Sequence, residues 1–248
     1  MESEILEQLG RNRRLVVGLS LASGVAGLVP LPLTGGVGIG LVRAFLVGRL
    51  ARRRALELPR GLTLVLAGGF RQPSLSRLAA IGAVVVGTRL AWRRLSRTLV
   101  TLLRFDEVGR TFLLGTYFEY YLLAHRRQQG PMTADEAGRL AEAIRRASAS
   151  AWGHLVTALF RKTVSDVVRA GTFVPRTLWS LARSAMENGE GDSVEQVVED
   201  DVHGFFGRVT QMLEHELSAT GKVTLEALCA AFDAAWTQPP LAATGASR

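Results

Sequence analysis

Few residues in this chain have both the type and the spacing that chemistry requires, and the clearest group is acidic. Asp200 and Glu199 precede His203 by three and four residues, so a helix would place these side chains on one face. Such a face could bind a divalent metal only if a second helix supplied further ligands. The surrounding run of carboxylates is typical of a solvated acidic face, and we therefore expect no metal site.

The other reactive residues lack a catalytic context. The single cysteine, Cys229, lies in an amphipathic helix pattern over residues 225–236, which favours a buried structural thiol over a nucleophile. The glycine-rich stretches at 35–40 and 68–69 are not followed by the Lys-Ser/Thr pair of a phosphate-binding loop. No serine has the context of a nucleophile elbow, and no histidine can be paired with a nucleophile. We expect a protein that is not an enzyme and has no cofactor.

Charge divides the chain into two parts. Residues 1–130 contain 19 basic and 7 acidic residues, whereas residues 131–248 contain 11 and 15. The basic part is also the apolar part, and anionic headgroups at the cytoplasmic face of a membrane attract such basic side chains. We therefore expect the protein at the cytoplasmic face of the bacterial inner membrane, in contact with anionic lipids. Nucleic acid is the less favoured acidic partner.

The longest uncharged tract runs from Leu15 to Val42. Its two legs, 15–29 and 33–48, would be about 22 and 24 Å long as helices, which is shorter than the roughly 30 Å hydrocarbon core of a bilayer. We expect a helical hairpin that inserts into the membrane or lies deep in its interface. The alternative is a hairpin buried inside a soluble helical bundle. The predicted turn comprises Pro30, Pro32, Thr34, Gly35 and Gly36.

Small residues and arginines suggest what the legs contact. Small side chains at four-residue spacing would let the two helices approach closely. They are Ser20, Gly24, Ser23, Gly27, Gly36 and Gly40. Arginines stand at both ends of the tract, and a predicted helix over 75–104 carries a stripe of them, as interfacial helices do. The predicted contacts to anionic lipid are Arg43, Arg49, Arg52, Arg53, Arg54, Arg89, Arg93, Arg97 and Arg104.

The remaining sequence predicts helices and no strand-rich domain. An aromatic helix is expected over 112–125, and its Glu119 should pair with an arginine of the stripe. Thr133 and Glu136 form a capping box that begins a helix ending near residue 151. The other expected helices cover residues 2–10, 152–170, 175–188, 193–218 and 224–237.

These patterns predict an all-α protein with three parts. Residues 1–130 form a basic, apolar, membrane-associated region with the N-terminal hairpin and amphipathic helices. Residues 131–238 form a small, acidic, soluble helical bundle. Residues 239–248, which include two prolines, form a flexible tail.

Two segments resemble a known family. The paired-proline segment Val25–Thr34 leads into an apolar helix over Leu41–Ala51, and the glycine-containing aromatic helix Val108–Leu122 precedes Gly130 and Thr133–Glu136. Both are similar to segments of the YcjF-type family of bacterial membrane-associated helical proteins, and the resemblance covers the first 150 residues. Because members of that family often occur beside or fused to Era-like or dynamin-like GTPases, the resemblance implies a GTPase partner. It implies no catalytic residues.

The leading hypothesis is a non-enzymatic membrane-associated protein that recruits or regulates a cytosolic partner, such as a GTPase, through its acidic part. One alternative is an oligomeric pore or channel component, a homo-oligomer assembled through the small residues of the hairpin. A second is a soluble nucleic-acid-binding protein that uses the arginines between Arg89 and Arg104.

Overall fold

The described residues of the computed structural model form helices and turns without a strand, which confirms the all-α prediction. The structure describes residues 2–26, 35–68, 105–126, 130–149, 151–169, 205–219 and 221–238. Its helices are α1 (Glu2–Arg11), α2 (Arg13–Ala26), α3 (Gly35–Arg53), α4 (Arg60–Leu66), α7 (Phe105–Tyr120), a π-helical turn (Tyr121–His125), α8 (Ala134–Ser148), α9 (Ala151–Arg169), α12 (Phe205–Ala219) and α13 (Gly221–Thr237).

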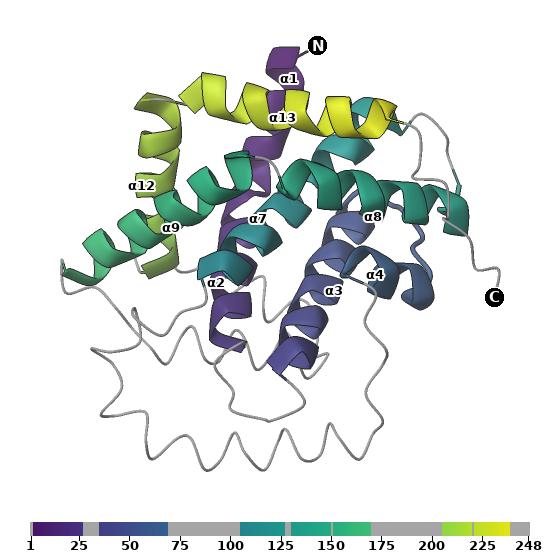
Figure 1. The fold of residues 1–248 in the computed structure, drawn as a ribbon, viewed down its shortest axis with the longest axis horizontal. Coiled ribbons are helices and arrows are strands. Elements are labelled where there is room, and N and C mark those ends of the chain that lie inside the picture. The colour runs from purple at the N-terminus through teal and green to yellow at the C-terminus, as the bar shows by residue number, and fades with distance from the viewer. Residues whose placement is uncertain are drawn as a thin grey trace, which may run out of the picture.

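Helix α2 lies at the centre of the bundle (Figure 1). Residues 15–24 of this helix are all buried, and α3, α7 and α12 pack around it. A helix that is apolar on every side is stable in a bundle only when it is covered on every side. The described part of the hairpin is therefore buried among other helices, as in the alternative considered above. No helix among the described residues is both long and apolar enough to cross a bilayer.

Helices α2 and α3 pack side by side and run in opposite directions, because the end of α3 contacts the beginning of α2 through Arg53 and Asn12. This is the arrangement expected for the two legs of a hairpin. Gly35 and Gly36 were predicted in the turn, but they are the first two residues of α3. The first amides of a helix have no acceptor within it, so glycine is tolerated there at little cost. Pro30, Pro32, Thr34 and Gly27 lie outside the described residues.

Two glycines of α7 allow close contact with neighbouring helices. A Cβ atom on Gly115 would lie 2.8 Å from Val16 Cγ1 and 3.0 Å from Leu46 Cδ2, so α7 sits directly on both legs of the hairpin. A Cβ atom on Gly109 would lie 2.5 Å from Thr157 Oγ1 of α9. The chain therefore uses α7 as the helix that brings the hairpin and the later helices together.

The small residues predicted to pack the legs are buried wherever the structure describes their surroundings. Gly24 and Gly40 are buried. The hydroxyl of Ser20 donates to the carbonyl of Val16 at 2.5 Å, and the hydroxyl of Ser23 donates to the carbonyl of Ser20 at 2.6 Å. Ser23 also donates to the carbonyl of Glu107 on α7 at 3.3 Å. These bonds to backbone carbonyls satisfy two buried hydroxyls that would otherwise destabilise an apolar helix.

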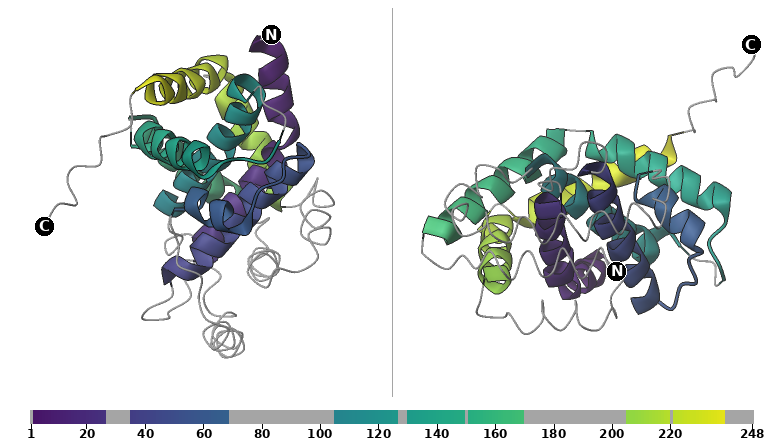
Figure 2. Two further views of the ribbon diagram at one scale, coloured as in Figure 1. Left: turned by 90° about the vertical axis from the view of Figure 1, so that its right-hand side faces the viewer. Right: turned by 90° about the horizontal axis from the view of Figure 1, so that it is seen from below.

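Helices from either side of residue 130 share one hydrophobic core (Figure 2). Phe112 of α7 meets Phe160 of α9 edge to face, with ring centroids 5.1 Å apart. Tyr117 of α7 stacks on Phe232 of α13 at 5.5 Å. The predicted boundary at residue 130 coincides with a change in composition, while the packing of the described helices continues across it.

Most of the predicted helices that fall on described residues are confirmed, and their ends are close to the expected ones. The capping box at α8 is present: Thr133 Oγ1 accepts from the Glu136 amide at 3.2 Å, and the Glu136 carboxylate accepts from the Thr133 amide at 3.4 Å. The helix predicted to begin at residue 112 begins at Phe105 instead. Of the helix predicted over 193–218, residues 205–218 lie in α12. The predicted helices over 75–104 and 175–188 lie outside the described residues.

Replacement of Gly115 by alanine tests whether α7 must approach the hairpin this closely. The new Cβ would press on Val16, a stiff side chain that is 2% exposed, and overpacking of this kind typically costs about 1–3 kcal/mol. We expect Gly115→Ala to lower the free energy of unfolding, measured by denaturant titration. The matched control is Gly61→Ala on α4, where a Cβ meets nothing within 4 Å and which should not destabilise the protein. Equal stability of the two variants would contradict the packing described here.

Candidate anion-binding surfaces

The antiparallel hairpin brings together the arginines at its two ends. Because α2 begins where α3 ends, Arg11, which precedes the first leg, lines the same hollow as Arg53 and Arg54, which follow the second. Asn12, the single residue between α1 and α2, accepts a hydrogen bond from Arg53 through its side-chain oxygen. We call this group the hairpin-base cluster; it comprises Arg11, Arg13, Arg14, Arg52, Arg53 and Arg54.

The end of α3 is shaped to hold Arg54 at this surface. Ala55 has a left-handed backbone (φ 52°), and the amide of Leu56 donates to the carbonyl of Ala51 at 2.9 Å. This is a left-handed helix cap, a conformation that glycine adopts more readily than alanine. Arg52 and Arg53 lie in the last turn of α3, where the helix dipole favours positive charge. The cap ends α3 at this point, and the helix dipole favours the basic side chains in its last turn.

Glu119 is a buried acid beneath the hairpin-base cluster. It is 1% exposed, and its carboxylate accepts from Asn12 Nδ2 at 2.5 Å and from Arg54 Nη2 at 3.3 Å. Burial raises the pKa of Glu119, although Asn12 and Arg54 both act to lower it. Arg54 also donates to Gln8 Oε1 of α1 at 3.1 Å. Glu119 thus ties α7 to both ends of the hairpin.

The pairing of Glu119 with an arginine of the stripe between residues 75 and 104 stays a prediction. Among the described residues, Glu119 pairs with Arg54 of the basic segment after the second leg. The reason is that α7 packs across the hairpin, so that Glu119 near the end of α7 reaches the end of α3. The stripe itself lies outside the described residues.

The outer side of the hairpin-base cluster is open to solvent. Arg11, Arg14, Arg52 and Arg53 are exposed, and Arg13 and Arg54 are half-buried. A hollow of about 390 Å³ is lined by Gln8, Arg11, Asn12, Arg53 and Arg54. Arg11 pairs with Glu7 at 3.4 Å, but both side chains are more than 70% exposed, so this pair contributes little to stability. The surface therefore has the charge and the accessibility to bind anions.

Arg43 has a different environment from the hairpin-base cluster. Its Nη2 atom donates to Glu107 Oε2 at 2.7 Å and its Nε atom donates to Thr111 Oγ1 at 3.0 Å, so it connects α3 to α7. Burial lowers the pKa of Arg43, and the ion pair with Glu107 acts against that shift. Arg43 is therefore held within the protein by a specific partner.

The predicted lipid contacts fall into three groups. Arg52 and Arg53 are exposed, whereas Arg43, Arg49 and Arg54 are half-buried. The arginines of the stripe, Arg89, Arg93, Arg97 and Arg104, lie outside the described residues. Contact of any of these residues with lipid stays a prediction.

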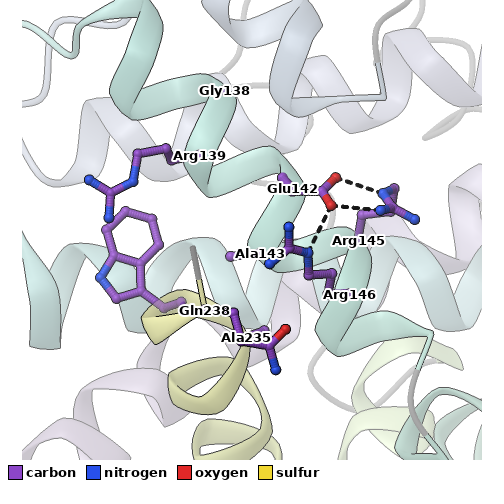
Figure 3. Close-up of a pocket in the computed structure, with 9 residues that line it drawn as sticks. Gly138, Arg139, Glu142, Ala143, Arg145, Arg146, Ala235 and Gln238 are labelled. Carbon is purple, nitrogen blue, oxygen red and sulfur yellow. Dashed lines mark hydrogen bonds and ion pairs between the residues drawn. The ribbon is translucent and has the colours of Figure 1, made fainter. Parts of the chain in front are cut away.

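A second basic surface lies between α8 and α13 (Figure 3). Glu142 is held by two neighbours on α8: Arg145 binds both of its carboxylate oxygens (2.6 and 2.8 Å), and Arg146 Nε binds one of them (2.8 Å). Arg139 lies over the indole of Trp236 of α13, 4.8 Å from the ring centre. A hollow of about 310 Å³ separates these two groups.

The chemistry of this hollow favours binding over proton transfer. The two guanidinium groups hold the pKa of Glu142 at about 2, so its carboxylate stays ionised near neutral pH and cannot act as a general acid. Three guanidinium groups face one carboxylate, so the local charge is positive. Sequence analysis identified the helix over 133–151 but not this hollow, because Trp236 comes to α8 only through the packing of α13.

A third polar group connects the π-helical turn to α13. Asp233 lies 2.7 Å from His125 Nε2 and accepts from the hydroxyl of Tyr120 at 2.9 Å. The nearby thiol of Cys229 is buried, and burial together with Asp233 and Glu226 raises its pKa to about 12. An acid with this pKa is protonated and unreactive near neutral pH. We therefore assign this group to packing.

No metal-ligating cluster of histidine, cysteine and carboxylate is present in the part of the chain that the structure describes. The predicted candidates around His203 lie outside that part.

The chain matches no family model, no curated protein and no solved structure. The resemblance to the YcjF-type family therefore stays an expectation from the two segments named above.

The raised pKa of Glu119 predicts a pH dependence of stability. A carboxyl group with a raised pKa in the folded state holds its proton more tightly there than in the unfolded chain, so its contribution to stability falls as pH rises above the unfolded value of about 4.3. Glu119→Gln removes this effect. We expect the free energy of unfolding of the variant, minus that of the unmodified protein, to increase as the pH rises from 4 to 7. Denaturant titrations at several pH values measure this difference, and a constant difference would contradict a raised pKa.

The ion pairs of Glu142 predict an unusual titration. In ¹³C carboxyl NMR spectra, Glu142 should remain ionised throughout the acidic range in which the protein is folded, because its pKa is about 2. In the double variant Arg145→Gln/Arg146→Gln, it should begin to take up a proton near the ordinary value of about 4.3. An unchanged titration curve in the variant would show that the two arginines do not hold this carboxylate in solution.

Proposed function

We propose that this protein is a non-enzymatic helical protein that binds the anionic cytoplasmic face of the bacterial inner membrane and recruits or regulates a cytosolic protein partner there. The observation that supports the proposal best is the hairpin-base cluster, in which arginines from both ends of the apolar tract share one surface. Asn12 and Glu119 fix the positions of Arg53 and Arg54 from below. A preorganised basic surface binds anions with little loss of conformational entropy.

The burial of α2 favours contact at the membrane surface over insertion of the hairpin. Its apolar residues pack against α3, α7 and α12 and stabilise the bundle, so their transfer into lipid would require the bundle to open. The arginines are accessible without any such change. Four exposed arginines at about 1 kcal/mol each would contribute roughly 4 kcal/mol at an anionic surface. This attraction is screened by salt.

The charge of the second half supports the recruiting role. Residues 131–248 contain more acidic than basic residues, and the excess comes from residues 187–201, which lie outside the described residues. An anionic bilayer would repel such an acidic segment, which would leave it available to a cytosolic partner. A GTPase is the partner that the resemblance to the YcjF-type family suggests.

Vesicle co-sedimentation tests the membrane part of the proposal. The charge-reversal variant Arg11→Glu/Arg14→Glu/Arg52→Glu changes only exposed side chains of the hairpin-base cluster. The unmodified protein should bind vesicles that contain phosphatidylglycerol and should not bind pure phosphatidylcholine vesicles. Binding should fall steeply between 50 and 500 mM salt, because salt screens the attraction between exposed charges. The Debye length is about 10 Å at 0.1 M ionic strength. The variant should lose most of the binding.

A charge-matched control separates the position of the arginines from their number. Arg60→Glu/Arg161→Glu/Arg208→Glu reverses three exposed arginines on α4, α9 and α12 and changes the net charge by the same amount. We expect this control to retain more binding than the first variant. Equal loss in both variants, or binding that does not depend on anionic lipid, would refute the assignment. Salt-sensitive binding to duplex DNA that only the first variant loses would show that the hairpin-base cluster also binds nucleic acid, and would contradict its assignment to the membrane alone.

A further inference from the structure

The hollow between α8 and α13 has features that the proposed membrane function does not use. We propose that it binds a small planar aromatic anion of the mononucleotide class. Four properties of the described residues support this: the local charge, a fixed aromatic wall, a floor of small residues, and a size suited to a small ligand.

The charge is positive and its carriers are held in place. Arg145 and Arg146 are anchored by Glu142 at 2.6–2.8 Å, so their guanidinium groups stay at one side of the hollow. Arg139 occupies the opposite side with Trp236, as Figure 3 shows. An anion in the hollow would therefore meet positive charge on both sides.

The aromatic wall is supported from behind. The Trp236 ring lies 5.0 Å from Tyr121 and 6.2 Å from Phe232, with centroid separations typical of packed aromatic pairs. His125 lies 5.9 Å from the same ring. The orientation of the indole is therefore set by the core. Arg139 lies over one face of the indole, so the guanidinium group of Arg139, which the indole supports, is the planar group on which a ligand ring can stack.

The floor of the hollow consists of small residues. Gly138, Ala143 and Ala235 line it, and a Cβ atom on Gly138 would meet nothing within 4 Å. The volume of about 310 Å³ lies at the lower end of the range for ligand pockets, roughly 300–1,000 Å³. A ligand with one base, one sugar and one phosphate is near the upper limit of this volume, and a dinucleotide exceeds it.

NMR of the tryptophan indoles tests the inference. The Trp236 indole resonance is identified by its absence from the spectrum of Trp236→Leu. The probes are adenosine 5′-monophosphate, which has a ring and a charged group, adenosine, which has only the ring, and inorganic phosphate, which has only the charge. We expect the monophosphate to shift the Trp236 resonance at lower concentration than either of the other two.

Two variants should change the affinity for the monophosphate in opposite directions. Glu142→Gln removes the one carboxylate among the described residues that line the hollow, while the amide oxygen of glutamine can still accept a hydrogen bond from Arg145 or Arg146. The variant should raise the affinity by about fivefold, the effect of one unit charge about 4 Å away in water. Arg139→Gln removes one positive charge and should lower it by about the same factor. A general loss of structure would not produce a gain in one variant and a loss in the other.

A third variant blocks the hollow without weakening the fold. Gly138→Leu places a side chain into the hollow from the middle of α8, and leucine is a better helix former than glycine. It should abolish the shift of Trp236 while the protein stays at least as stable, and Gly61→Leu on α4 serves as the matched control that retains binding. Binding of the monophosphate that survives Gly138→Leu, or equal binding of inorganic phosphate, would overturn the inference. Because the hairpin-base cluster is intact in all these variants, vesicle binding should not change.

Discussion

The structure depends on the burial of one apolar helix. Helix α2 has no polar face, so every side of it must be covered, and α3, α7 and α12 provide that cover. This requirement explains why glycine stands at position 115, where α7 crosses both legs of the hairpin. It also explains why Ser20 and Ser23 turn their hydroxyls back to their own helix, since no water reaches them.

Among the described residues, the buried amide and carboxylate side chains lie where the apolar helix begins. At that point Asn12 and Glu119 are both buried, and they satisfy each other and the arginines at the end of α3. The hairpin therefore has two parts of different character. Its legs are apolar and buried, and the end at which α2 begins and α3 ends is charged. Without Asn12 and Glu119, the arginines at the end of α3 would have no buried partners to hold them at this surface.

Much of the fold was predictable because its signals are local. The capping box at Thr133 and Glu136, the helices over 152–170 and 224–237, and the antiparallel legs all follow from residues close together in the chain. The beginning of α3 was misplaced, because glycine favours turns but is also tolerated in the first turn of a helix.

What could not be predicted depends on contacts between distant residues. Apolar character alone does not distinguish a helix buried in protein from one buried in lipid, since both surroundings accept the same side chains. The pairing of Glu119 with Arg54 and the approach of Trp236 to α8 depend on how helices cross, and no local spacing encodes that. The hollow beside Trp236 is therefore a product of tertiary packing.

The side-chain amide of Asn12 makes the buried acid and the surface arginines parts of one thermodynamic system. Its nitrogen donates to Glu119 and its oxygen accepts from Arg53, while Arg54 contacts Glu119 directly. An anion bound beside these arginines offsets the positive charge that favours the ionised form of the carboxylate, so anion binding promotes proton uptake. By the reciprocity of linked equilibria, protonation of Glu119 must then strengthen anion binding by the same factor. The protein surface would in this way respond to acidity without any histidine taking part.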